Sequence, residues 1–141
     1  MTSLKVSTKL STNKFMWTSN GLIMSYLDHK DSKKTMKVSK YSDLIQSINA
    51  GLISGTENTQ NACAFAMVLA AKSLRSSDNM YYSKLLKICL DIELINKNHL
   101  SKIAKRMLAA GDDADGPVNG PDVVIKRMVI EANKIQAENI V

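Results

Sequence analysis

The sequence predicts an α+β fold in which a small N-terminal antiparallel β-meander packs on a larger C-terminal bundle of helices, so that helix dominates. Three observations lead to this expectation. Residues 1–40 alternate between apolar and polar side chains with the period of a strand, residues 41–141 follow the period of a helix, and strands and helices do not alternate along the chain. The 141 residues are expected to form a single domain with three or four short strands and about five helices.

The centre of the expected bundle is the stretch 62–71, in which ten consecutive residues have no polar side chain. Five of the ten are alanines and only Val68 is β-branched, which favours a helix over a strand. Ser54 and Glu57 have the spacing of a capping box and predict the start of this helix. A helix that is apolar on every side needs neighbours on every side, so residues 62–71 are expected to be buried.

Alternation of apolar and polar residues predicts four strand candidates before this helix. Asn20 and Gly21 form the strongest short-range hairpin signal in the sequence and are expected to join the second candidate to the third. The four candidates span residues 4–10, 14–18, 22–27 and 35–39.

Four further helices are expected around the central one. Ser42 is expected to cap a short helix that stops at Gly51, and Pro121 suits the first turn of the last helix. The two helices between them follow from wide apolar stripes and from glycine or polar residues at their ends. The expected ranges of the four are 42–51, 77–95, 98–111 and 121–135.

Composition favours an intracellular protein, cytoplasmic or nuclear. The two cysteines, Cys63 and Cys89, lie on apolar helix faces as expected for buried free thiols. The N-terminus has no apolar segment typical of a signal peptide, and the central apolar run is shorter than the ~18 to 20 residues of a membrane span. The protein is therefore expected to be neither secreted nor transmembrane. Frequent Lys, Asn, Ile, Ser and Met indicate an AT-rich genome, such as that of a virus.

Positive charge is concentrated in residues 1–40. This region has eight lysines against Asp28 and Asp31, whereas residues 41–141 have eleven basic and eleven acidic side chains. The entire net charge of +6 therefore belongs to the basic, β-rich region 1–40, and the helical region 41–141 is neutral. The eight lysines are Lys5, Lys9, Lys14, Lys30, Lys33, Lys34, Lys37 and Lys40.

No motif for catalysis or metal binding is found. The acidic loop 111–122 fails the EF-hand pattern: counted from Asp113, Pro117 and Val118 stand where a ligand and the turn glycine are required, and Val124 stands where the final glutamate is required. His29 and His99 have no second histidine or cysteine at ligand spacing. The sequence therefore predicts a protein that is not an enzyme and has no metal, cofactor or small-molecule substrate.

The main functional hypothesis is binding of RNA or DNA through the basic sheet. The eight lysines are expected to follow a phosphate backbone without strong sequence preference, with Trp17 and Tyr26 stacking on bases. The alternative is a protein–protein adaptor, virion structural component or matrix protein, in which the lysines are a solvated surface or face an anionic membrane.

Self-association is expected to occur through the helices, most simply as a dimer. Val124 and Ile130 fall outside the main apolar stripe of the last helix, and this excess of apolar surface could be covered by a second copy. The residues predicted to form this interface are Val124, Met128 and Ile130.

Overall fold

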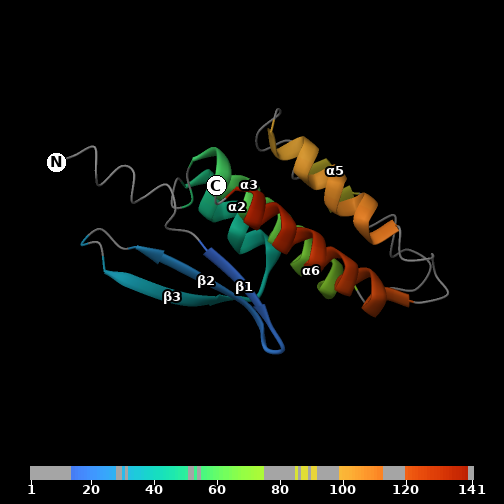
Figure 1. Ribbon diagram of the computed structural model, residues 1–141, viewed down its shortest axis with the longest axis horizontal. Helices are drawn as coiled ribbons and strands as arrows, with labels where there is room; N and C mark the ends of the chain where they lie inside the picture. Colours follow the sequence, from blue (N-terminus) through green and yellow to red (C-terminus); the bar gives the residue numbers. More distant parts are fainter. Residues whose placement is uncertain are drawn as a thin grey trace.

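The computed structural model confirms an α+β architecture dominated by helix. It describes residues 14–27, 30, 32–50, 53, 55–74, 85, 87–88, 90–91, 99–112 and 120–139. Within these ranges a three-stranded antiparallel sheet lies against four helices, slightly fewer elements than the three or four strands and about five helices expected. Figure 1 shows the strands as one layer and the helices as the other.

The sheet consists of β1 (Lys14–Thr18), β2 (Gly21–Leu27) and β3 (Lys33–Val38), in the spatial order β1-β2-β3. Gly21 begins β2 with φ of 120°, a conformation that favours glycine, so the Asn-Gly pair does mark the first hairpin. The Thr18 hydroxyl closes this turn by donating to the Gly21 carbonyl (2.8 Å) and accepting from the Asn20 N–H (3.2 Å). The strand candidate 4–10 lies outside the described residues.

The central helix is α3 (Thr56–Ser73), and every residue from 61 to 71 is buried, as expected. Its start differs from the expectation. The N-cap is Gly55 with φ of 90°, and no side chain caps the helix. The capping box centred on Ser54 was therefore wrong, because the chain enters α3 through a left-handed residue, which only glycine adopts without strain. The Thr59 hydroxyl instead donates to the Gly55 carbonyl at 2.8 Å.

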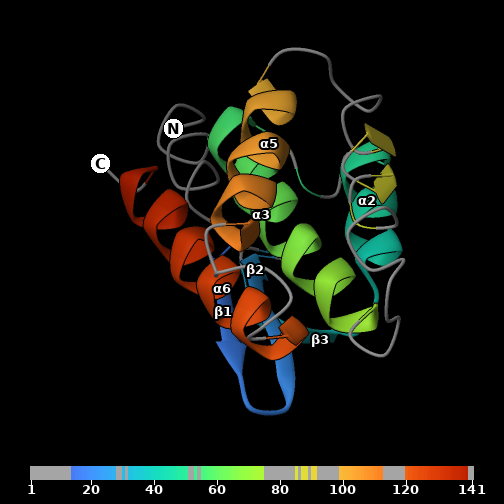
Figure 2. The same cartoon turned by 90° about the vertical axis from the view of Figure 1, so that its right-hand side faces the viewer.

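Three helices pack around α3: α2 (Tyr41–Asn49), α5 (His99–Asp112) and α6 (Gly120–Glu138). Figure 2 shows α3 between α2 on one side and α5 and α6 on the other. Helix α2 begins at Tyr41 after the N-cap residue Lys40, two residues earlier than a helix capped by Ser42 would begin, and no side chain caps it, so the expected Ser42 cap was wrong. Of the helix expected over 77–95, residues 85, 87–88 and 90–91 are described and are helical.

The sheet is joined to the helices through both its side chains and its edge. Phe15 of β1 stacks on Phe65 of α3, with ring centroids 5.4 Å apart and ring planes at 21°. The Gln136 side chain of α6 accepts from the Phe15 N–H and donates to the Phe15 carbonyl, both at 2.8 Å. One strand residue is therefore fixed by an aromatic contact from α3 and a pair of hydrogen bonds from α6.

The structure corrects the expected interface on the last helix. Val124 is only 4% exposed, because α6 packs closely on α5 at Gly111. The close approach is possible because Gly111 has no side chain: a Cβ at this position would lie 2.9 Å from Val124 Cγ1. Met128 is fully buried at the same contact, whereas Ile130 is 52% exposed. Two of the three residues predicted for self-association therefore belong to the core of one chain.

Candidate nucleic-acid interface

Strand register sorts the side chains of the sheet onto two faces. Cross-strand partners project to the same side, and successive residues of one strand project to opposite sides. Phe15, Leu22 and Met24 are buried against the helices and define the inner face. The other set forms the outer sheet face, whose described side chains are Lys14, Met16, Thr18, Ile23, Ser25, Lys33, Thr35 and Lys37.

The outer sheet face carries three of the predicted lysines in fixed register. Lys37 shares a cross-strand row with Ile23 and Met16, and Lys14 shares the next row with Ser25 and Thr35. Lys33 follows one row further, opposite Leu27. The three lysines are exposed, and Met16 between them is 62% exposed. The sheet thus presents an open basic surface with hydroxyl and apolar groups between the charges.

Lys34 is on the other face of β3, in register with Tyr26. It is nevertheless exposed, as is its inner-face neighbour Met36 at 45%. Figure 1 shows the reason, since the end of the β2–β3 pair reaches beyond the helices. Lys34 therefore adds positive charge beside Lys33 at the start of β3, without belonging to the outer sheet face.

The remaining predicted lysines flank the strands or lie outside the described residues. Lys30 and Lys40 are exposed, before and after β3 respectively. Lys5 and Lys9 fall outside the described ranges. The three strands themselves contain four lysines and no acidic residue.

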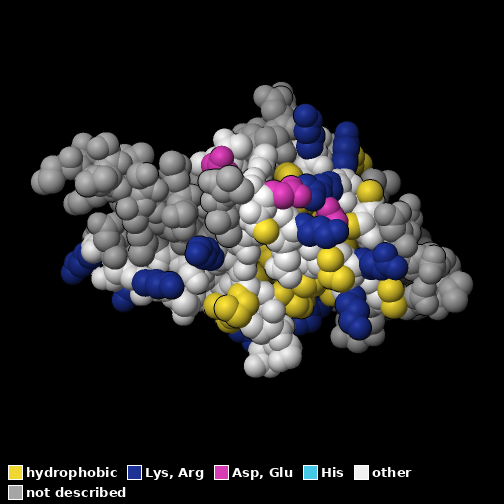
Figure 3. All heavy atoms as spheres, viewed as in Figure 1, with side chains coloured by type: hydrophobic (Ala, Val, Ile, Leu, Met, Phe, Trp, Pro, Cys, Tyr) yellow, Lys and Arg dark blue, Asp and Glu magenta, His cyan; other side chains and the backbone are white. Residues whose placement is uncertain are grey.

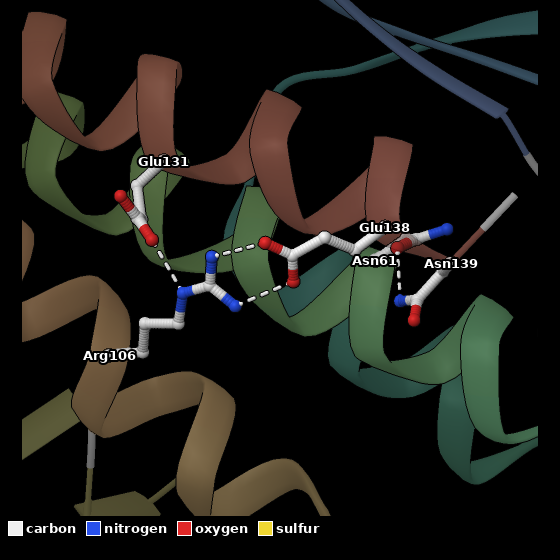
Figure 4. Close-up of polar contacts among 5 residues, drawn as sticks. All are labelled: Asn61, Arg106, Glu131, Glu138 and Asn139. Carbon is white, nitrogen blue, oxygen red and sulfur yellow. Dashed lines mark hydrogen bonds and ion pairs between the residues drawn. The ribbon is translucent and has the colours of Figure 1, made fainter. Parts of the chain in front are cut away.

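Charge on α5 and α6 is arranged differently, because acidic side chains lie among the basic ones and two of them pair with Arg106. In Figure 3 magenta and blue side chains lie together over these helices, whereas blue is the only one of the two charged colours over the strands at the lower left. Arg106 of α5 donates from Nη1 and Nη2 to the two carboxylate oxygens of Glu138, both at 2.9 Å, and from Nε to Glu131 (Figure 4). Both glutamates belong to α6, so this guanidinium ties the two helices together.

This ion-pair network shifts the pKa values of Arg106 and Glu138. The hydrogen bond from Arg106 lowers the pKa of Glu138 below its usual range, although that carboxylate is solvent-exposed. The same bond is the main reason why the pKa of Arg106 is raised above its already high value. Next to it the side-chain amide of Asn139 donates from Nδ2 to the side-chain Oδ1 of Asn61 at 2.9 Å and joins the end of α6 to α3 (Figure 4). These polar groups connect helices and are already engaged within the chain.

The aromatic residues predicted to stack on bases lie on the inner face. Trp17 and Tyr26 are half-buried and pack against the core cluster. The Lys72 ammonium of α3 lies 5.5 Å from the centroid of the Trp17 ring, as in a cation–π contact. The structure therefore brings Lys14, Lys33 and Lys37 together on one face, but does not place Trp17 and Tyr26 beside them.

Sequence reasoning missed the uncharged members of the outer sheet face. Ser25 and Thr35 lie in register between lysine-bearing rows, and Met16 and Ile23 form its apolar centre. The signal was present: the Asn-Gly turn sets the register, and residue parity along each strand then assigns the faces. Applied to β1, the same parity separates Trp17 from Lys14.

The described residues offer no support for metal binding or for a membrane span. No group of three or more His, Cys, Asp and Glu side chains among them could hold a metal ion. The described helices include none with the length and apolar character needed to span a membrane. Cys63 is buried, and its thiol donates a hydrogen bond to the Leu100 carbonyl oxygen, with Sγ 3.7 Å from the oxygen. Cys89 and His29 lie outside the described ranges.

Comparison with known proteins gives a fold but no family. No protein-family model matches the chain, and no curated protein matches it. Among solved structures it is similar to the crystal structure of the translation initiation factor eIF-2B, subunit delta, from A. fulgidus, with a TM-score of 0.74 and 18% sequence identity. The match covers 92% of this chain but 38% of that chain. The protein therefore has the fold of a segment somewhat longer than a third of that subunit.

Proposed function

We propose that this protein is a non-enzymatic nucleic-acid-binding protein whose outer sheet face contacts the phosphate backbone. The observation that carries the proposal is the placement of Lys14, Lys33 and Lys37 on one exposed face of strands that contain no acidic residue. The helices α5 and α6 also carry exposed cations, such as Lys126 and Arg127, but acidic residues lie among them and Glu131 and Glu138 pair with the guanidinium of Arg106.

The dimensions of the face suit contacts to several phosphates. Adjacent strands lie about 4.8 Å apart, so Lys14 on β1 and the lysines on β3 are separated by roughly 10 Å across the sheet. Lys33 and Lys37 are four residues apart on one strand, or roughly 13 Å. Ser25 and Thr35 lie between them and supply hydroxyl donors, which are common partners of phosphate oxygens. Such contacts fix position on a backbone and carry no sequence information.

RNA is tested beside DNA, since the solved neighbour is a subunit of a translation initiation factor. That subunit's role is not transferred to this chain, which spans only 38% of its length. The proposal depends on the sheet surface of this protein alone.

The decisive measurement is the salt dependence of affinity, by fluorescence anisotropy with labelled RNA and DNA. Three phosphate contacts give an expected slope of log K against log salt of roughly −2.7 on duplex DNA and roughly −2.1 on a single strand. The double variant Lys33→Ala/Lys37→Ala should flatten the duplex slope by about 1.8.

Two matched controls separate contact from net charge. Lys126→Ala/Arg127→Ala on α6 removes the same charge from exposed positions on another element, and should leave the slope nearly unchanged. Lys34→Ala removes one lysine from β3 but from the opposite face, so its effect should be smaller than that of Lys33→Ala or Lys37→Ala alone. Equal losses for the β3 and α6 double variants would contradict binding through the sheet.

Failure of the parent protein to bind RNA or DNA at low salt would refute the proposal. The lysines would then be a solvated surface, as in the adaptor or structural-component alternative. Flotation with anionic vesicles, run in parallel, tests the membrane-facing version of that alternative: capture by vesicles without nucleic-acid binding would favour a matrix protein.

Self-association through α6 is the second component of the proposal. Ile130 is the member of the predicted set that remains exposed, and it lies on the solvent side of α6. Light scattering at high micromolar concentration should show a dimer that Ile130→Lys converts to a monomer. A parent protein that is monomeric at this concentration would exclude self-association without affecting the test of nucleic-acid binding.

A further inference from the structure

We infer that the ligand of the outer sheet face is a double-stranded nucleic acid and that single strands bind more weakly. This inference rests on the proposed function and specifies its substrate class. Its basis is the sorting of side chains between the two sheet faces. The outer sheet face holds lysines, hydroxyls, Met16 and Ile23, whereas the rings of Phe15, Trp17 and Tyr26 are on the inner face.

Surfaces that bind single strands combine positive charge with aromatic side chains on which the bases stack. The aromatic half of that combination is engaged elsewhere in this sheet. Phe15 stacks on Phe65, the Trp17 ring lies beneath the Lys72 ammonium, and Tyr26 packs against the core. An unstacked base on the described outer sheet face would meet Met16 and Ile23, which have no flat ring.

A duplex can be bound through its phosphates alone, and the outer sheet face has the lysine and hydroxyl groups for such contacts. It turns its backbone outward and presents about one negative charge per 1.7 Å of helix axis, twice the density of one strand. Lysine and hydroxyl groups spread over three strands can contact phosphates without any base leaving the stack. A patch of fixed size therefore neutralises more charge on a duplex, and each neutralised phosphate releases more counterion there than on a single strand.

The test compares duplex and single-stranded oligonucleotides of equal length and unrelated sequence, as both RNA and DNA, with the whole 141-residue chain. The two expected slopes differ by about 0.6, so affinities that are equal at 1 M salt should differ roughly sixfold at 50 mM salt, with the duplex bound more tightly. Between 50 and 200 mM salt three contacts predict an affinity loss of about 40-fold on duplex DNA and about 18-fold on a single strand.

A gain-of-function variant supplies the missing ring. Met16→Trp places an aromatic side chain in the middle of the outer sheet face, at a position that is 62% exposed and tolerant of a larger group. Stacking on one base should raise single-strand affinity roughly 5- to 150-fold and leave duplex affinity nearly unchanged. The matched control Tyr26→Leu, on the inner face, should change neither affinity, and thermal melting checks that both variants are folded.

The outcomes distinguish this inference from the proposed function. A parent protein that binds single strands as tightly as duplexes, or more tightly, would overturn the duplex inference and leave nucleic-acid binding intact. Absence of a single-strand gain in Met16→Trp would refute the argument that single strands bind more weakly because the outer sheet face lacks a ring. Absence of binding to every oligonucleotide would instead refute the proposed function itself.

Discussion

Because α5 and α6 approach closely at Gly111, we expect the effect of Gly111→Ala on stability to change sign when the neighbouring Val124 is shortened to alanine. Gly111 lies in the last turn of α5 and is buried. A Cβ added there would lie 2.9 Å from Val124 Cγ1, closer than two carbon atoms tolerate, and 3.3 Å from Met128 Sδ. The methionine can give way because its thioether chain is flexible, but the β-branched valine has little rotamer freedom.

Two opposing contributions set the magnitude. Alanine is better than glycine in a helix by up to ~1 kcal/mol, whereas overpacking a well-filled core costs about 1 to 3 kcal/mol. Gly111→Ala is therefore expected to destabilise the parent by as much as ~2 kcal/mol. In a Val124→Ala background the obstructing methyl groups are absent, so the same substitution should stabilise by up to ~1 kcal/mol. The expected coupling between the two sites is about 1 to 3 kcal/mol.

Urea denaturation followed by circular dichroism on the four proteins of this double-mutant cycle measures the coupling, provided that the m-value stays constant. Val124→Ala alone should cost about 1.6 kcal/mol for two lost methyl groups, plus a contribution from the cavity that it leaves. If Gly111→Ala stabilises the parent as much as it stabilises the Val124→Ala variant, the helices separate without cost at this point and the packing argument fails.

Two further predictions concern the core and the ion-pair network. Phe65→Ala removes a fully buried ring that stacks on Phe15 and should lower the free energy of unfolding by about 3 to 5 kcal/mol, measured by urea denaturation; a loss below about 1 kcal/mol would contradict its central position. Glu138 has a pKa lowered in the folded state from 4.5, so its contribution to stability is present above that pH and is lost as pH falls through the folded pKa. Melting curves should therefore show a shallower loss of Tm below pH 4.5 in Glu138→Gln than in the parent, and equal acid sensitivity would mean that the pair contributes nothing in solution.

The sequence was most informative where one signal determined both structure and burial. An unbroken apolar run rich in alanine favours a helix surrounded by neighbours, and residues 61–71 are buried accordingly. The start of that helix was mispredicted because Ser54 offers a capping hydroxyl, whereas the backbone at Gly55 requires a positive φ that composition alone does not reveal. The capping preference of serine thus placed the helix start one residue too early, and the backbone conformation at Gly55 sets it.

The candidate site was predictable in charge but not in geometry. Lysine content identified the sheet as the basic region. Proximity in sequence, however, grouped Trp17 with Lys14, although strand residues three positions apart project to opposite faces. The prediction that Val124 belongs to an interface was wrong for a different reason. It appeared to lie outside the apolar stripe of α6, and only the partner helix, with a glycine facing it, widens the buried surface enough to include it.

The Gln136 side chain gives the sheet two unequal edges. Its amide carries a carbonyl oxygen and an NH2 group, and each of the two makes one hydrogen bond with the backbone of Phe15 at 2.8 Å, as a neighbouring peptide group would. On the β1 side a helix thus supplies, through one side chain, some of the hydrogen bonding that a fourth strand would otherwise supply. An incoming strand would have to displace this amide and α6 with it. In the described sheet, growth by strand addition is therefore directed to β3, where Lys33, Lys34 and Lys37 repel another copy of the same strand.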